Sequence, residues 1–210
     1  MRFPVIWLRL CLSVIFLRLF DFFSYLDAVT PRKVGRMPFD LQPTLNGKLV
    51  QLRPLRTDDY EALYAVATDP LIWEQHPLKD RFKEEVFQQF YRDALESGGT
   101  LIIVDKKDGR VIGSSRFHGY NAEQSEVEIG WTFLARSHWG GVYNGEIKQL
   151  MLRHAFQFVE KIIFLIAPQN IRSQKAVEKI GAVRTARPDP TGSNNVVYEV
   201  TLSKFAKQNR

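Results

Sequence analysis

The chain has 210 residues, a formal net charge of +6, 45% hydrophobic and 25% charged residues, which suits one soluble globular domain, or one domain with an appendage. Its single cysteine, Cys11, excludes an intrachain disulfide framework and a cysteine-rich metal site. The basic balance favours anionic partners, but no Lys/Arg block marks a nucleic-acid tail, so we expect no nucleic-acid partner.

The first 36 residues differ from the rest. Residues 3–23 are apolar and aromatic, but three charges interrupt them, and a spanning helix wants about 20 mostly apolar residues. Three interpretations stay open: a membrane-facing helix, a helix docked on the domain, or a stretch preceding a true start at Met37. The third is slightly favoured, because Met37 leads into the first predicted strand. We therefore expect a hydrophobic leader over residues 1–36 and a domain over residues 37–210.

The domain begins with a strand and two helices. Residues 48–53 alternate in polarity and predict the strand. Thr57 and the two acids that follow it suit a helix start, because a hydroxyl can accept an end N–H and acids favour the positive helix end. A second helix is predicted over residues 82–96, closed by two glycines.

Three strands and a long helix come next. The strands are predicted over residues 100–105, 111–119 and 125–134. Residues 144–159 repeat apolar side chains at helical spacing and predict an amphipathic helix.

The last part predicts an apolar strand over residues 161–167, a short helix over residues 173–180, and a hairpin of residues 183–187 with residues 196–202. The strand is apolar throughout, which indicates burial on both faces. The order of elements predicts an α/β (α+β) fold with a mixed, partly antiparallel central sheet and helices on both faces.

Two passages can hold chemistry. In residues 129–148 a strand runs through a glycine turn into a helix, whose unpaired first amides and positive dipole end suit a phosphate or pyrophosphate. A plain tight turn is the alternative. In residues 163–183 an apolar strand ends near Asn170 and a helix starts near Ser173. Asn170 can be a turn or cap residue, and Ser173 an N-cap.

Together these passages resemble the GNAT (N-acetyltransferase) superfamily, and within it the branch of ribosomal-protein N-terminal-alanine acetyltransferases. The likeness extends from about Lys48 to Leu202. Residues 139–143 (WGGVY) resemble the branch's Trp-Gly-x-Gly-Tyr start of the cofactor helix. Residues 170–182 (NIRSQKAVEKIGA) resemble its Asn-x-x-Ser…Glu-Lys-Leu-Gly-Phe signature.

The glycine loop departs from the family pattern. Val142 holds the middle glycine position and Asn144 the last. Because Val142 has a Cβ, it cannot take a positive φ cheaply. Either the loop bends through Gly140 and Gly141 instead, or the phosphate cradle is altered.

The resemblance implies a GNAT-like transferase: residues 37–210 form a single acyl-CoA N-acyltransferase domain that moves an acetyl group from acetyl-CoA, as co-substrate, directly to a primary amine. The acceptor is a protein N-terminus or a small-molecule amine. A catalytically weak or inactive acyl-CoA-binding regulatory module is the alternative. We expect a cytoplasmic monomer or homodimer, with a membrane partner only if the leader is real. We expect no metal, since the histidines and the cysteine lack ligand spacing.

The resemblance also implies the cofactor contacts. The backbone after residue 130 would pair with the pantetheine arm, and the helix start after the glycine loop would hold the pyrophosphate. Arg136, Arg172 or Lys175 could meet the nucleotide phosphates as point charges. The acetyl-CoA-binding residues are then Trp131, Thr132, Phe133, Leu134, Trp139, Gly140, Gly141, Val142, Tyr143, Asn144, Asn170, Arg172 and Ser173.

An ammonium acceptor must lose a proton before it attacks, so a base is needed. Glu128 is the first choice, because it lies on the strand that leads to the cofactor. Glu126 shares its face, and His118 is the alternative. The resemblance adds Ser173 as the proton donor to the leaving thiolate, and Asn170 near the acyl group or the cofactor arm.

The acceptor itself cannot be read from the sequence. The loops over residues 71–81 and 188–195, where specificity is expected, contain no motif. Trp73, His76 and Trp131 either line the acceptor pocket or belong to the core, which is the commoner role of tryptophan.

Overall fold

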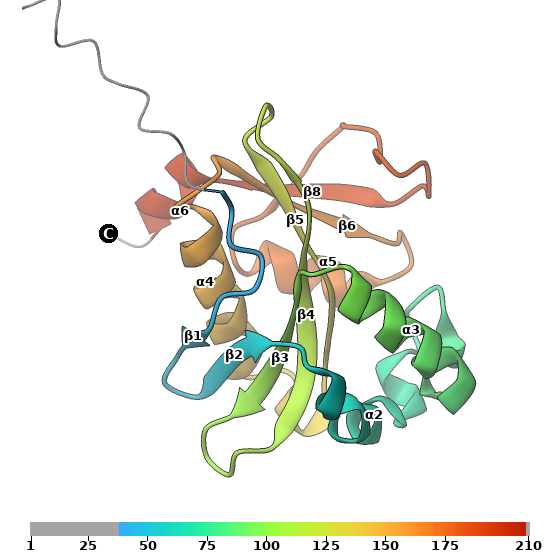
Figure 1. Ribbon diagram of the computed structural model, residues 1–210. Coiled ribbons are helices and arrows are strands. Elements are labelled where there is room, and N and C mark those ends of the chain that lie inside the picture. The colour runs from blue at the N-terminus through green and yellow to red at the C-terminus, as the bar shows by residue number, and fades with distance from the viewer. Residues whose placement is uncertain (1–37, 209–210) are drawn as a thin grey trace, which may run out of the picture. The chain divides into compact units, whose positions relative to one another are not determined.

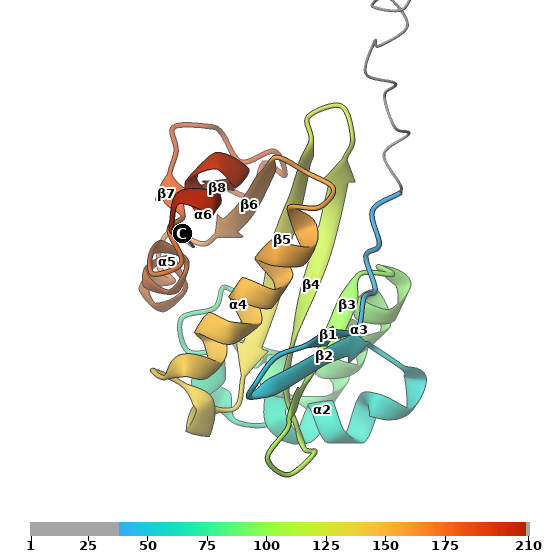
Figure 2. The same cartoon turned by 90° about the vertical axis from the view of Figure 1, so that its left-hand side faces the viewer.

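The computed structural model describes residues 38–208 and contains an eight-stranded sheet with helices on both faces (Figures 1 and 2). The leader over residues 1–36 lies outside the described residues. The strands are β1 (Leu45–Asn46), β2 (Val50–Pro54), β3 (Thr100–Asp105), β4 (Val111–Asn121), β5 (Glu126–Leu134), β6 (Lys161–Ile166), β7 (Val183–Arg184) and β8 (Val196–Thr201).

Helices and short 3-10 turns connect the strands. The α-helices are α2 (Tyr60–Ala67), α3 (Glu84–Glu96), α4 (Val142–Ala155), α5 (Ile171–Glu178) and α6 (Leu202–Gln208). The 3-10 turns are η1 (Thr57–Asp59), η2 (Pro70–Ile72), η3 (Lys79–Phe82) and η4 (Arg136–His138). Within residues 38–208, no helix is both long enough and apolar enough to cross a membrane.

The sheet order is β1-β2-β3-β4-β5-β6-β8-β7. Neighbouring strands are antiparallel except β5 and β6, which run parallel. The predicted fold class, a mixed and partly antiparallel sheet between helices, is therefore confirmed.

A core lies on each face of the sheet. Helices α4, α5 and α6 contribute to one apolar cluster and α2 and α3 to the other, and Figure 2 looks onto the face that α4 covers. Strand β3 shows how both are filled: Leu101 and Ile103 belong to the α4 cluster, and Ile102 belongs to the α2–α3 cluster. Side chains alternate along a strand, so an apolar run of this kind serves both faces.

The parallel pair is short. Residues Glu126, Val127 and Glu128 of β5 pair with Lys161, Ile162 and Ile163 of β6, and there the pairing stops. Strand β5 continues to Leu134 beside β4, and β6 continues to Ile166 beside β8. The two strands therefore separate, and residues 129–134 of β5 have no strand partner on the β6 side.

Several predicted boundaries were wrong for local reasons. Residues 57–59 form η1 and the helix starts at Tyr60, without a cap from the Thr57 side chain. Asp59 instead receives the forked Arg53 guanidinium and the Arg56 N–H. The helix predicted over residues 144–159 runs from Val142 to Ala155.

Other elements have no signal in the polarity pattern. Strand β1 and the terminal helix α6 were not predicted, and β7 is only two residues long. The short helix α5 begins at Ile171, because the Asn170 side chain accepts a hydrogen bond from the Ser173 N–H at 3.1 Å. Asn170 is therefore the N-cap, and the reading of Ser173 as the N-cap was wrong.

Candidate active site

The loop between β5 and α4 bends through its glycines. Gly140 adopts φ +69°, in the left-handed region that a Cβ disfavours, and Gly141 is the extended N-cap of α4. Val142 is the first helical residue, and its side chain is 68% exposed. Of the two alternatives for this loop, the bend through Gly140 and Gly141 is the one observed. The first amides of α4 have no side-chain cap, which leaves a positively polarised helix end.

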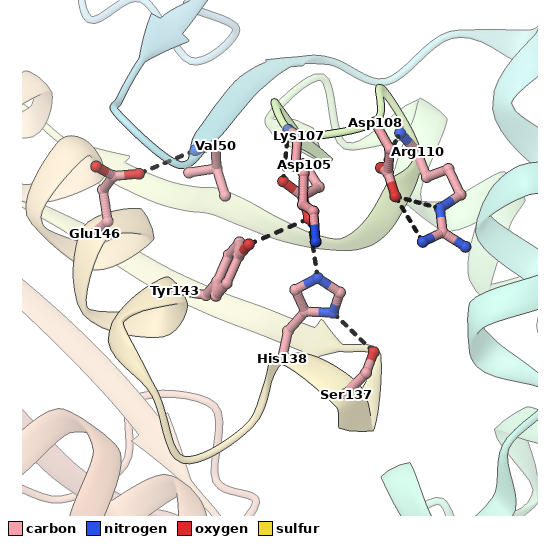
Figure 3. Close-up of polar contacts among 9 residues, drawn as sticks. All are labelled: Val50, Asp105, Lys107, Asp108, Arg110, Ser137, His138, Tyr143 and Glu146. Carbon is pink, nitrogen blue, oxygen red and sulfur yellow. Dashed lines mark hydrogen bonds and ion pairs between the residues drawn. The ribbon is translucent and has the colours of Figure 1, made fainter.

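A buried carboxylate at the end of β3 fixes this helix start (Figure 3). Asp105 accepts hydrogen bonds from the Tyr143 hydroxyl and the Lys107 N–H and lies 3.2 Å from His138 Nε2. The Lys107 N–H contributes most to holding the pKa of Asp105 below its usual range. The loop residue His138 and the first turn of α4 are thus tied to one strand end.

A second carboxylate holds α4 one turn further on. Glu146 accepts the backbone N–H groups of Lys48, Leu49 and Val50 at 2.7, 2.8 and 3.0 Å. These amides form the turn into β2, and the bond to Val50 is visible in Figure 3. A Cβ on Gly47 would lie 2.6 Å from the Glu146 carboxyl carbon, so a larger residue here would displace this carboxylate. The position of the helix start is therefore set by two independent anchors.

The strand before the loop contains a bulge. In the β4–β5 pair, Ser114 lies opposite Phe133 and Arg116 opposite Gly130, so β5 has one extra residue between these pairs. Trp131 lies within the bulge and has φ +50°, an uncommon conformation for a bulky residue. Such strain is concentrated at functional sites. The bulge begins where β5 has already left β6.

Under α4 lies a buried amine that the sequence did not reveal as a site residue. The Lys148 ammonium donates to Thr132 Oγ1 at 2.6 Å and to Ser115 Oγ at 3.4 Å. It also lies 5.8 Å from the centroid of the Phe164 ring. Burial lowers the pKa of Lys148 to about 7. Since Thr132 is on β5 and Phe164 on β6, Lys148 lies where the two strands diverge.

Of the two candidate carboxylates, Glu128 is the one without an ion-pair partner in the described residues. Its carboxylate forms no hydrogen bond or ion pair within residues 38–208, and burial, followed by the charge of Asp189, raises its pKa to about 7. Arg116 opposes this shift. Glu126, in contrast, forms ion pairs with Arg187 and Lys161. Glu128 therefore combines a buried position with a pKa near neutrality, which suits a general base.

His118 lies directly opposite Glu128 in the β4–β5 pair. Its ring packs against Trp131, with centroids 5.0 Å apart. Burial, with a contribution from Arg116, lowers the pKa of His118. The imidazole is consequently neutral at pH 7, and it shares this region with Glu128.

A cation–π contact between two loop and helix ends also joins the two predicted passages. The Arg172 guanidinium, at the start of α5, stacks 4.1 Å from the centroid of Trp139, in the loop before α4. It also donates to the Ile72 carbonyl at 2.7 Å. Arg136 is paired with Asp69. These two predicted phosphate-binding cations thus also hold protein segments together, while Lys175 is exposed.

The remaining predicted residues lie at the end of β5, in the glycine loop and in the first turn of α4. Phe133 and Leu134 are buried in opposite cores, so the backbone of these residues, not the side chains, faces the gap left by β6. The Trp139 Nε1–H donates to the Leu134 carbonyl at 2.9 Å, which folds the loop back onto β5. Asn144 lies in the first turn of α4. Within residues 38–208, no group of three or more His, Cys, Asp or Glu side chains is arranged to hold a metal ion.

Comparison with known proteins defines the class. A family model described as the acetyltransferase (GNAT) domain matches residues 50–183, from β2 to the first residue of β7. With the fold, this match defines an acetyltransferase. The chain belongs to the GNAT acetyltransferase domain family.

Solved structures agree with this assignment. The chain is similar to a candidate acetyltransferase with 29% identity, 78% of this chain and 89% of that chain covered, and a TM-score of 0.64. A candidate acetyltransferase from T. thermophilus has 28% identity, 78% and 92% coverage and a TM-score of 0.62.

A more distant structure shares the fold. A candidate ribosomal-protein-serine acetyltransferase from Vibrio cholerae has 15% identity, 76% and 97% coverage and a TM-score of 0.62. The search of curated proteins gave no match.

Proposed function

We propose that residues 37–210 form a single acyl-CoA N-acyltransferase domain that moves the acetyl group of acetyl-CoA to a primary amine. One observation carries the proposal: β5 leaves β6 beside the uncapped start of α4, with Glu128 buried on the same strand. The unpaired β5 backbone of residues 129–134 suits the amide groups of a pantetheine arm. The first amides of α4 suit a pyrophosphate.

The reaction needs one base and one proton donor. The amine gives up a proton, its nitrogen forms a bond to the thioester carbonyl carbon, the C–S bond breaks, and the thiolate takes up a proton. Glu128 is the proposed base, because a pKa near the working pH makes proton transfer efficient. Ser173 is the proposed donor to the thiolate. The Asn170 oxygen caps α5, so its amide NH₂ is the group proposed to face the cofactor arm.

The remaining finer predictions follow from the same assignment. We propose acetyl-CoA contacts for the 131–134 and 139–144 backbone and for Arg172, which already lies between the two passages. The likeness to the Vibrio cholerae protein covers the fold alone, so the ribosomal-protein branch remains a proposal. A cytoplasmic location and a monomeric or dimeric state also remain predictions.

Glu128 gives the sharpest test. Acetyl-CoA should raise the thermal unfolding midpoint of both wild type and Glu128→Gln, because a ligand that binds the native state stabilises it. In an amine screen that reads released thiol, kcat/KM of the wild type should rise with pH through about 7 and then level off. Glu128→Gln should lower kcat by about 10²- to 10⁴-fold and abolish that pH limb.

The outcomes separate the hypotheses. Glu123→Gln, on an exposed turn, is the matched control and should leave rate and profile unchanged. Absence of stabilisation by millimolar acetyl-CoA would contradict the enzyme proposal. Stabilisation without acetylation of any amine would favour the regulatory module instead.

A further inference from the structure

Two arginines are buried on the α2–α3 face of the sheet. Arg81, in η3, is 8% exposed, and Arg116, in β4, is 4% exposed. Within residues 38–208, neither forms a salt bridge. Since a buried charge normally requires an ionic or well-bonded partner, the pair calls for an explanation.

The surroundings of Arg81 are aromatic and neutral. Its guanidinium lies 4.7 Å from the centroid of Phe90 and 5.5 Å from that of Trp73. Nη1 is 3.1 Å from His76 Nε2. Burial and the charge of Arg81 lower the pKa of His76 to about 4, so the imidazole is neutral at pH 7. Its Nδ1 accepts the Leu78 N–H at 2.9 Å, so Nε2 carries the ring proton and offers Arg81 no acceptor.

Arg116 is also incompletely paired. Its Nε donates to Thr100 Oγ1 at 2.9 Å, and its guanidinium lies 4.7 Å from the centroid of Trp131. The Nη2 atom is buried and has no hydrogen-bond partner in the described part of the chain. Buried nitrogen atoms of this kind are rarely left unpaired, because the desolvation penalty is about 1–3 kcal/mol or more for charged groups.

The two guanidinium groups also act on each other. Burial and then the charge of Arg116 lower the pKa of Arg81 to about 10, and burial lowers the pKa of Arg116. Asp93 opposes both shifts and Glu128 opposes that of Arg116, but neither carboxylate is in contact with a guanidinium. The two cations therefore influence each other, and no carboxylate of residues 38–208 forms an ion pair with either.

The register places this pair beside the proposed base. Arg116 lies opposite Gly130, and Glu128 is two residues along the same strand. Alternation puts Arg116 and Glu128 on one face, with diagonal neighbours on paired strands about 7–8 Å apart. This is the α2–α3 face, opposite the one that α4 covers (Figures 1 and 2). The distance is within the reach of one small molecule.

We propose that the acceptor amine carries an acid group, a carboxylate or a phosphate, which binds at Arg81 and Arg116 while its amine meets Glu128. The inference deepens the proposed function and rests on it. The guanidinium fork matches either oxyanion, and the anion would supply the partner that Arg116 Nη2 lacks. Among small-molecule amines, a polyamine is disfavoured, since it would bring further positive charge to two buried cations.

The test compares acceptors that differ only in the acid group. Amino acids are paired with their amides, and phosphoethanolamine with ethanolamine, with released thiol as the readout. We expect kcat/KM of the preferred acid to exceed that of its neutral partner by at least about tenfold. The two pairs distinguish a carboxylate from a phosphate. Arg116→Gln and Arg81→Gln should remove this preference, mainly through KM, and Arg116→Lys should keep part of it.

Two controls distinguish a loss of acid recognition from a loss of folding or of catalytic activity. Arg92→Gln removes an exposed charge from α3 and should leave the preference intact. Thermal shifts with CoA and N-acetylated amino acids, against N-acetylated amino acid amides, report acid recognition without turnover. If Arg116→Gln does not fold, Arg81→Gln and Arg116→Lys decide.

Three outcomes would overturn the inference: equal rates for acids and amides, equal loss of both in the arginine variants, or equal shifts with acetylated acids and amides. In each case stabilisation by acetyl-CoA would leave the proposed function standing. Absence of that stabilisation is the separate failure of the proposed function.

Discussion

At the scale of single residues, the buried amine of Lys148 makes the stability of the fold depend on pH. Its amine is buried under α4 with two hydroxyl groups as partners, and no carboxylate of residues 38–208 forms an ion pair with it. Its pKa is about 7 in the folded chain and about 10.4 in an unfolded one. Between these values the unfolded chain binds more protons, so stability rises with pH through this window and is lowest below pH 7.

Replacing Lys148 by methionine should therefore stabilise the protein. We expect the free energy of unfolding at pH 6–7 to rise by about 1–3 kcal/mol, because an apolar chain of similar length replaces a buried charge. The gain should shrink as the pH approaches 10. Urea unfolding of both proteins across this range measures it, with the exposed Lys179→Met as control. Destabilisation at every pH would show that the fold needs the amine.

The same residue shows the limit of sequence reasoning. The apolar spacing of Ile147 and Met151 predicts the buried face of α4. Lys148 lies between them, and its charge gives no indication in the sequence that it is buried. Arg81 and Arg116 are similar: a charged residue in a predicted loop or strand indicates a solvated surface unless the fold is known. Glu128, on the other hand, was predicted from its place on the strand before the glycine loop.

At the scale of elements, α4 depends on contacts from distant parts of the chain. Glu146 accepts hydrogen bonds from three backbone N–H groups that have no partner on a neighbouring strand. A carboxylate accepts such bonds better than an amide, which would turn donor hydrogens toward donors.

We expect Glu146→Gln to lower the free energy of unfolding by about 2 kcal/mol or more, because hydrogen bonds to a charged group are lost and buried N–H groups remain unpaired. Acetyl-CoA affinity should fall too, since the helix start moves with the anchor. Denaturant unfolding and a binding titration give the two values. Glu123→Gln, on the exposed turn after β4, is the comparison. An unchanged unfolding midpoint would show that the turn before β2 does not depend on this carboxylate.

Regular elements were easier to predict than their interruptions. The bounds of β3 were predicted residue for residue, because a run of β-branched side chains between two glycines and a turn leaves little choice. The bulge at Trp131 was not predicted, since one extra residue in a strand leaves the polarity pattern almost unchanged. The early end of the β5–β6 pairing depends on both strands together, so the sequence of neither strand alone predicts it.

At the scale of the molecule, the family match lies within the described fold and covers most of it. The match spans residues 50–183 and the described residues are 38–208. The elements outside the match, β1, β8 and α6, contribute to the sheet edge or to the core.

A chain starting at Met37 should therefore unfold in one cooperative transition and bind acetyl-CoA as tightly as the full chain. Calorimetry and a titration of both proteins test this. A lower midpoint or weaker binding for the shorter chain would show that residues 1–36 support the domain. Fractionation of both proteins between membrane and supernatant separately tests the membrane-facing interpretation.

The three residue pairs that join β5 to β6 have a mechanical consequence. They join two half-sheets, β1–β5 and β6–β8, and beyond these pairs the two halves are held together by side-chain packing and not by a ladder of backbone bonds. The separation of β5 and β6 beyond these pairs then depends on the volume of core side chains such as Met151 of α4, and on the Arg172–Trp139 contact. In the proposed enzyme, the length of acyl chain that fits would thus be set by packing, so a substitution in the core could change it while leaving Glu128, Asn170 and Ser173 in place.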